Sequence, residues 1–182
     1  MLNISRTAAV LTTVAFALSL AAPAASQDSK SAPLARQLAQ LLDAQKVDSI
    51  AAADPETGGF VAAIYVPGTQ LLVVGGKFAS PDIGNYRLSK NEFRELYMDL
   101  TGGSDPASRI FASDVSADGL VISPKGDAPA DVWEHGTTKR AFLGARKARL
   151  KEDEYLRVYS EADAQYARML ALLVAQAKPK TS

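Results

Sequence analysis

Two apolar runs separated by a short turn constrain the fold more than any other part of this sequence. Residues 60–66 (FVAAIYV) and 70–78 (QLLVVGGKF) are rich in β-forming side chains. Pro67-Gly68 suits the centre of a type II turn, because proline fixes the first φ and glycine accepts a positive second φ. Apolarity without alternation indicates burial on both faces. We therefore expect central strands, with Gly75-Gly76 marking a bulge or a close backbone approach.

Helical periodicity appears on either side of this central region. Leu34, Leu38, Leu41 and Leu42 form one face of a helix that begins near Ser31 and ends near residue 46. A second helix is expected from Glu152 to about Lys178, with these apolar residues along one side: Tyr155, Tyr159, Ala162, Tyr166, Met169 and Leu173. That side either packs on the domain's own sheet or forms a partner-binding or homodimer seam.

The middle of the chain divides into short segments. Residues 80–91 are polar and predict a loop with a helical turn, whereas residues 92–100 (EFRELYMDL) fit either a helix or a strand. Residues 132–143 predict one strand or a hairpin that turns near Gly136. The sequence therefore predicts an α+β fold: a single antiparallel sheet or small split barrel of five to six strands, flanked by an N-terminal helix and a long C-terminal helix.

The first 26 residues have the layout of a secretory signal peptide. Arg6 precedes an apolar core at residues 8–20, and small residues follow at 21–26. We expect cleavage after Ser26 or Ala24, a single domain over residues 27–182, and a periplasmic or extracellular location. After cleavage we expect a soluble protein without a membrane anchor.

Composition excludes several classes of function. The chain has no cysteine and one histidine, which rules out thiolate metal sites and sites with several histidines in one chain. Lys+Arg and Asp+Glu both number 20, so the chain lacks the basic excess of a nucleic-acid binder. Gly102-Gly103-Ser104-Asp105-Pro106 misses the nucleophile elbow of serine hydrolases, because Pro106 replaces the last glycine.

One segment matches the first half of a calcium-binding loop. Asp114, Ser116 and Asp118 occupy the first, third and fifth positions, and Gly119 occupies the sixth. Position 12, however, is Lys125 where a glutamate should close the site. Residues 109–115 and 120–123 also look like strands rather than helices. We therefore predict a hairpin with a tight Asp-Gly turn rather than a metal site.

Candidate cofactor contacts are few. Trp133 and His135 are the only residues of their types, and His135 could act as an acid–base group or a haem ligand. Lys77, at the end of the second apolar run, is the third candidate. With no complete catalytic constellation, we expect a non-catalytic domain that binds a partner protein or small ligand. The alternative is a flavin- or haem-binding protein with oxidoreductase activity.

The stretch IAAADPETGGFVAAIYV (residues 50–66) resembles the opening strand, Asp-rich turn and second strand of the flavin-binding split-barrel superfamily, whose best-known member is pyridoxamine-phosphate oxidase. QLLVVGGKF resembles its third strand, and residues 80–91 its following helix. In this resemblance residues 92–100 form a strand paired with residues 109–115, and FMN is the implied cofactor. If residues 92–100 are helical, the element order is also similar to a profilin-like or roadblock-like sandwich.

Overall fold

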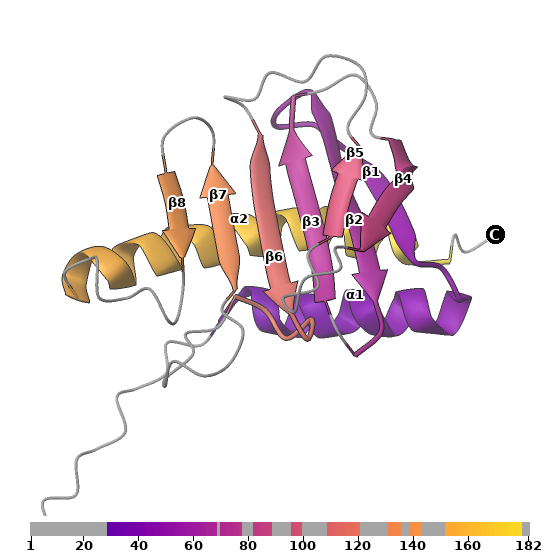
Figure 1. Cartoon of the computed structure of the whole chain (residues 1–182), viewed down its shortest axis with the longest axis horizontal. Helices are drawn as coiled ribbons and strands as arrows, with labels where there is room; N and C mark the ends of the chain where they lie inside the picture. The colour runs from indigo at the N-terminus through magenta and orange to yellow at the C-terminus, as the bar shows by residue number, and fades with distance from the viewer. Residues whose placement is uncertain are drawn as a thin grey trace, which may run out of the picture.

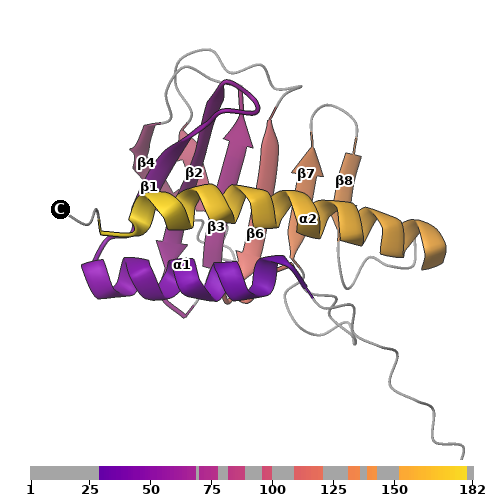
Figure 2. The same ribbon diagram turned by 180° about the vertical axis from the view of Figure 1, so that it is seen from behind.

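An open antiparallel sheet carries both helices on one of its faces in the computed structural model (Figures 1 and 2). The structure describes residues 29–68, 70–77, 82–88, 96–99, 109–120, 131–135, 139–142 and 152–179. The elements are α1 (Ser31–Gln45), β1 (Ser49–Asp54), β2 (Gly59–Val66), β3 (Gln70–Gly76), β4 (Asp82–Leu88), β5 (Leu96–Asp99), β6 (Ile110–Val115), β7 (Val132–His135), β8 (Lys139–Phe142) and α2 (Glu152–Ala177).

The six-stranded sheet has the order β1-β2-β3-β6-β7-β8, and every neighbouring pair is antiparallel. The two apolar runs form β2 and β3, which lie inside the sheet as predicted. Their register runs from Phe60 opposite Gly76 to Val66 opposite Gln70. The α+β class and the two flanking helices are confirmed. Because β1 and β8 are separate edges, the sheet does not close into a barrel, which was the alternative.

Alternate residues of β2 and β3 are buried on opposite faces of the sheet. Val61, Ala63 and Tyr65 belong to the main core between the sheet and the two helices. Ile64 and Leu72 form a smaller buried cluster on the other face. The β4–β5 pair lies on that second face, where β4 contacts β1 and β2 (Figures 1 and 2). The unbroken apolarity of these strands thus follows from burial on both sides.

The two helices run side by side in the same direction (Figure 2). Ser31 at the start of α1 bonds to Asp163, and the Gln45 amide at its end donates to the Ala177 carbonyl at 2.8 Å. Both pairs are 132 residues apart in the chain. The predicted apolar side of α2 is covered by the chain's own sheet and α1, because Tyr159 and the residues that follow it on this side are buried.

Gly75, in the Gly75-Gly76 pair where the sequence suggested a close approach, lies directly against the Met169 side chain of α2. A Cβ atom added there would lie 2.9 Å from the Met169 side chain, which is tighter than ordinary contact. Gly76 meets Gly59 in the same way, since a Cβ on Gly59 would lie 2.0 Å from the Gly76 carbonyl oxygen. Glycine therefore lets α2 pack closely on β3 and lets β2 and β3 approach each other closely here.

The expectation for residues 80–91 is wrong, because residues 82–88 form a strand. β4 pairs with β5, and the register shifts between Asp82 and Tyr86. Such a bulge breaks the period-two apolar pattern of a strand, and for this reason the sequence pattern of residues 80–91 did not indicate a strand. Residues 92–100 include the strand β5 rather than a helix, but it pairs with β4. The pairing of residues 92–100 with residues 109–115, implied by the split-barrel resemblance, is therefore not formed.

The prediction for residues 132–143 is confirmed as a hairpin, with β7 paired to β8. The hairpin expected between residues 109–115 and 120–123 is wrong. β6 lies between β3 and β7, and Leu120 lies in a bend. Residues 121–123 are outside the described part. β6 is therefore stabilised by pairing with β3 and β7, which are distant from it in the sequence.

The expected signal peptide at residues 1–26 lies outside the described residues, as do Gly136 and residues 102–106. In the part of the chain that the structure describes, no helix has the length and apolarity needed to cross a membrane.

Candidate functional site

A tight polar turn follows directly after β6. The buried carboxylate of Asp114 accepts hydrogen bonds from the backbone amides of Asp118 (3.1 Å) and Gly119 (3.0 Å). Ser116, Ala117 and Gly119 have positive φ angles of 70°, 53° and 94°. The first two are unfavourable for residues with a side chain, so contacts from outside the turn must hold it. The predicted Asp-Gly turn is present.

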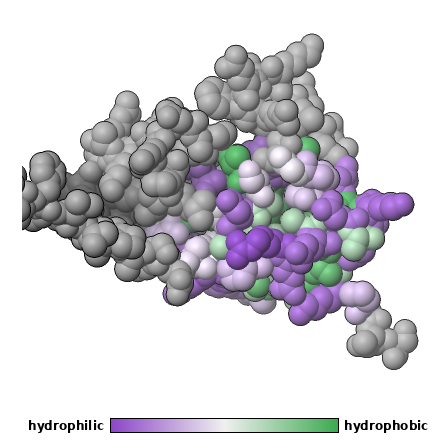
Figure 3. Space-filling view, turned by 90° about the horizontal axis from the view of Figure 1, so that it is seen from below, coloured by the Kyte–Doolittle hydropathy of each residue, from purple (hydrophilic) through white to green (hydrophobic). Residues whose placement is uncertain are grey.

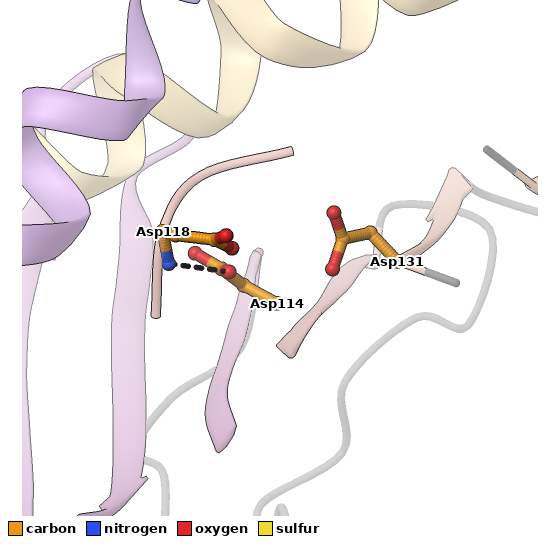
Figure 4. Close-up of side chains that lie close together, drawn as sticks. All are labelled: Asp114, Asp118 and Asp131. Atoms are coloured by element: carbon orange, nitrogen blue, oxygen red, sulfur yellow. Dashed lines mark hydrogen bonds between the residues drawn. The ribbon is translucent and has the colours of Figure 1, made fainter. Parts of the chain in front are cut away.

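Asp131 brings a third carboxylate to this turn. It immediately precedes β7, the neighbour of β6, and its Oδ1 accepts the Val115 amide at 2.8 Å. One carboxylate oxygen from each of Asp114, Asp118 and Asp131 lies within 4.8 Å of the other two. The three side chains point toward one another (Figure 4). We call these three residues the carboxylate cluster.

Burial dominates the electrostatics of the cluster. Desolvation raises the pKa of Asp114 to about 7, although hydrogen bonds from the Tyr166 hydroxyl and the Gly119 amide act in the opposite direction. The Tyr166 hydroxyl donates to Asp114 Oδ2 at 2.9 Å. Burial also raises the pKa of Asp118, against a backbone hydrogen bond, a side-chain hydrogen bond with Asp114 and the attraction of Arg36. Charge is thus costly at this site unless a proton or a cation compensates it.

One oxygen of the cluster has no hydrogen-bond partner among the described residues. Asp118 Oδ1 is a buried atom that accepts no hydrogen bond from a described donor, although the Asp118 and Asp114 carboxyl groups lie close enough to share a proton. Both oxygens of Asp114, in contrast, accept backbone or hydroxyl hydrogens. A buried unpaired carboxylate oxygen is unfavourable, because it has lost water without gaining a donor.

The sequence pattern identified two of the three members of the cluster. Asp114 and Asp118 are brought together as the calcium-loop spacing requires, whereas the third residue of that motif, Ser116, is exposed. Lys125, which argued against a metal site, lies outside the described residues. Asp131 was missed, because only the pairing of β6 with β7 shows that it lies beside the turn.

The candidate cofactor contacts lie away from the cluster. Lys77 directly follows β3, and His135 is the last residue of β7. Both lie at the same end of the sheet, because Gly75 of β3 and His135 of β7 are both paired with Ile110 of β6. The carboxylate cluster is at the opposite end. Trp133 is 4% exposed and belongs to the main core on the helix side. Lys77 is exposed, and the side chain of His135 is outside the described part.

The described surface offers no large apolar patch for a partner. Val47 is the exposed large hydrophobic residue among those described. The coloured part of the face in Figure 3 is mainly hydrophilic, with apolar residues scattered among the hydrophilic ones. Within the described part, the carboxylate cluster is a group of three acidic side chains whose spacing suits a metal ion.

Comparisons with protein families, curated proteins and solved structures give no match to this chain. The resemblance to the flavin-binding split-barrel superfamily, the FMN that it implies and the haem considered for His135 stay predictions.

Proposed function

We propose that this protein is an exported, non-catalytic binding domain whose ligand is a divalent cation, calcium before others, held by Asp114, Asp118 and Asp131. The export part rests on the signal-like residues 1–26. Sequencing the N-terminus of the protein recovered from the periplasm or medium tests that part. A chain that still begins at Met1 would contradict it.

The donor set favours a hard cation. All three side chains offer carboxylate oxygens, which are the ligands that calcium and magnesium prefer. Oxygens bound to one calcium ion at about 2.3–2.6 Å lie no more than about 5 Å apart. The 4.8 Å limit on the oxygen separations meets this requirement. Magnesium, with bonds of about 2.0–2.1 Å, needs oxygen–oxygen separations of about 4.2 Å or less, which a limit of 4.8 Å does not guarantee.

The buried, unpaired Asp118 Oδ1 is the observation that carries the proposal. A bound cation would pair this oxygen and reduce the repulsion between three neighbouring carboxylates. It would also answer the objection that position 12 of the motif is a lysine, because Asp131 supplies the missing carboxylate from the next strand. The support is thus both chemical and geometric.

The expected affinity is modest. Three carboxylates with one oxygen each fill three of the six to eight positions around calcium, and the remainder fall to other oxygens and water. Sites of extracellular modules bind calcium with dissociation constants of about 10⁻⁴ to 10⁻³ M. We expect a value in this range, which suits a compartment outside the cytoplasm.

Calorimetric titration of the metal-free protein with calcium tests the proposal. We expect binding by the unmodified chain and binding about tenfold weaker or more in Asp131→Asn, which removes one charged ligand. Glu161→Gln is the matched control, because Glu161 lies on the exposed side of α2 and pairs only with Arg157 in the described contacts. Absence of both binding heat and thermal stabilisation at about 10⁻² M calcium would refute the cation site.

A further inference from the structure

A buried carboxylate outside the carboxylate cluster, that of Asp163 on α2, holds the N-terminus of α1. Asp163 accepts hydrogen bonds from the Ser29 hydroxyl (2.8 Å), the Lys30 amide (2.7 Å), and the amide (3.1 Å) and hydroxyl (2.6 Å) of Ser31. The first turn of a helix has free amides and a partial positive charge, so a carboxylate there is favourable. Asp163 therefore caps α1 from another helix.

Ser31 connects this cap to the turn that carries Asp118. Its side chain is fully buried, and its hydroxyl donates to Asp163 while accepting the Leu120 amide at 3.0 Å. Leu120 is two residues after Asp118. The first turn of α1 packs closely against this turn, because a Cβ atom added to Gly119 would lie 2.5 Å from the Cα atom of Ala32.

We infer that Ser31 and Asp163 are positioning residues of the carboxylate cluster: Asp163 orients the Ser31 hydroxyl, and Ser31 fixes the backbone just beyond Asp118. This inference rests on the proposed cation site for its functional meaning. Neither residue belongs to the cluster, and both act through the Leu120 amide.

The turn needs such an anchor because its own conformation is unfavourable. Ser116 and Ala117 both have positive φ, which costs about 1 kcal/mol or more for each residue. α2 holds the turn at two points that are one helical turn apart, through Tyr166 on Asp114 and through Asp163 and Ser31 on Leu120. Loss of one point lets the segment containing Asp118 move away from the other carboxylates.

Ser31→Ala and Asp163→Asn test the inference against two matched controls. Ser29→Ala removes the hydrogen bonds that Ser29 makes with the same carboxylate, with the Ser31 hydroxyl and with the Ala32 amide, but none of the described hydrogen bonds joins Ser29 to the turn. Glu161→Gln removes one charge from the exposed side of the same helix. We expect calcium affinity to fall about three- to tenfold in Ser31→Ala and Asp163→Asn, and to stay within about twofold in the controls. Ser31→Thr keeps the hydroxyl and should retain the affinity even if its extra methyl lowers the melting temperature.

Amide hydrogen exchange gives a second measurement that does not depend on calcium. In Ser31→Ala the amides of residues 118–120 should exchange faster, while those of β3 keep their protection. If the unmodified chain binds no calcium, the proposed function fails, and this exchange pattern alone supports or overturns the positioning role. If calcium binds and Ser31→Ala changes neither the affinity nor the exchange of these amides, the positioning role is overturned and the cation site stands. Equal acceleration of the β3 amides would also overturn it, because the variant would then act through global stability.

Discussion

We expect the stability of the protein to fall as pH rises from about 4 to about 8, and we expect Asp114→Asn to flatten this fall. In the folded protein, burial raises the pKa of this carboxyl from 3.8 to about 7. Between these two values the folded chain holds a proton that the unfolded chain has released. The stability contributed by the protonated group is therefore complete below the unfolded pKa and is lost as pH rises through the folded one.

The size of this effect follows from the shift in pKa. The difference between 3.8 and about 7 corresponds to about 4 kcal/mol, at 1.36 kcal/mol for each pKa unit. Burial of Asp118 raises its pKa as well, so some pH dependence remains in the variant. Tyr166→Phe acts in the opposite direction to Asp114→Asn. It removes the hydroxyl that lowers the pKa of Asp114, so stability should keep falling to a higher pH.

Urea unfolding followed by tryptophan fluorescence measures this prediction. Trp133 is the only tryptophan and is 4% exposed, so its emission reports the loss of the core. The buffers should contain a chelator, because a bound cation would replace the proton at Asp114. We expect the difference in unfolding free energy between the two proteins to change by about 4 kcal/mol across this range. Parallel pH profiles, with a difference that changes by less than about 1 kcal/mol, would refute the reasoning.

Two further substitutions test the packing by thermal or chemical unfolding. Arg168→Met leaves the buried carboxylate of Asp54 without the guanidinium that lies 2.9 Å away, and should lower the free energy of unfolding by about 1–3 kcal/mol. The control, Arg157→Met, changes an exposed ion pair and should lower it by less than about 0.5 kcal/mol. Equal losses in the two variants would contradict the role of the Asp54 pair. Gly119→Ala combines a positive φ with a steric overlap and should cost about 2 kcal/mol or more. Gly58→Ala has the positive φ but open space and should cost about 1 kcal/mol, so a smaller loss at Gly119 would count against the packing of this turn on α1.

Local patterns were sufficient to predict the elements whose residues determine them directly. The strands β2 and β3 follow from apolar runs and the Pro67-Gly68 turn, and the bounds of α1 and α2 follow from helical spacing and terminal residues. The Asp114–Gly119 turn also follows from neighbouring residues, because a short acidic side chain and a glycine close it. Each of these features depends on residues close together in the chain.

Tertiary structure alone decided which segments meet. A bulge concealed β4, and the pairing of β6 with β7 brought Asp131 to a turn where the sequence pattern had indicated Asp114, Ser116 and Asp118. The bonds from Ser31 to Asp163 likewise join residues 132 positions apart. Strand register and helix packing depend on the burial of the whole core, and no local pattern records them. The sequence by itself determined the pieces and their chemistry, whereas packing between distant segments determined that three acids and their supports share one place.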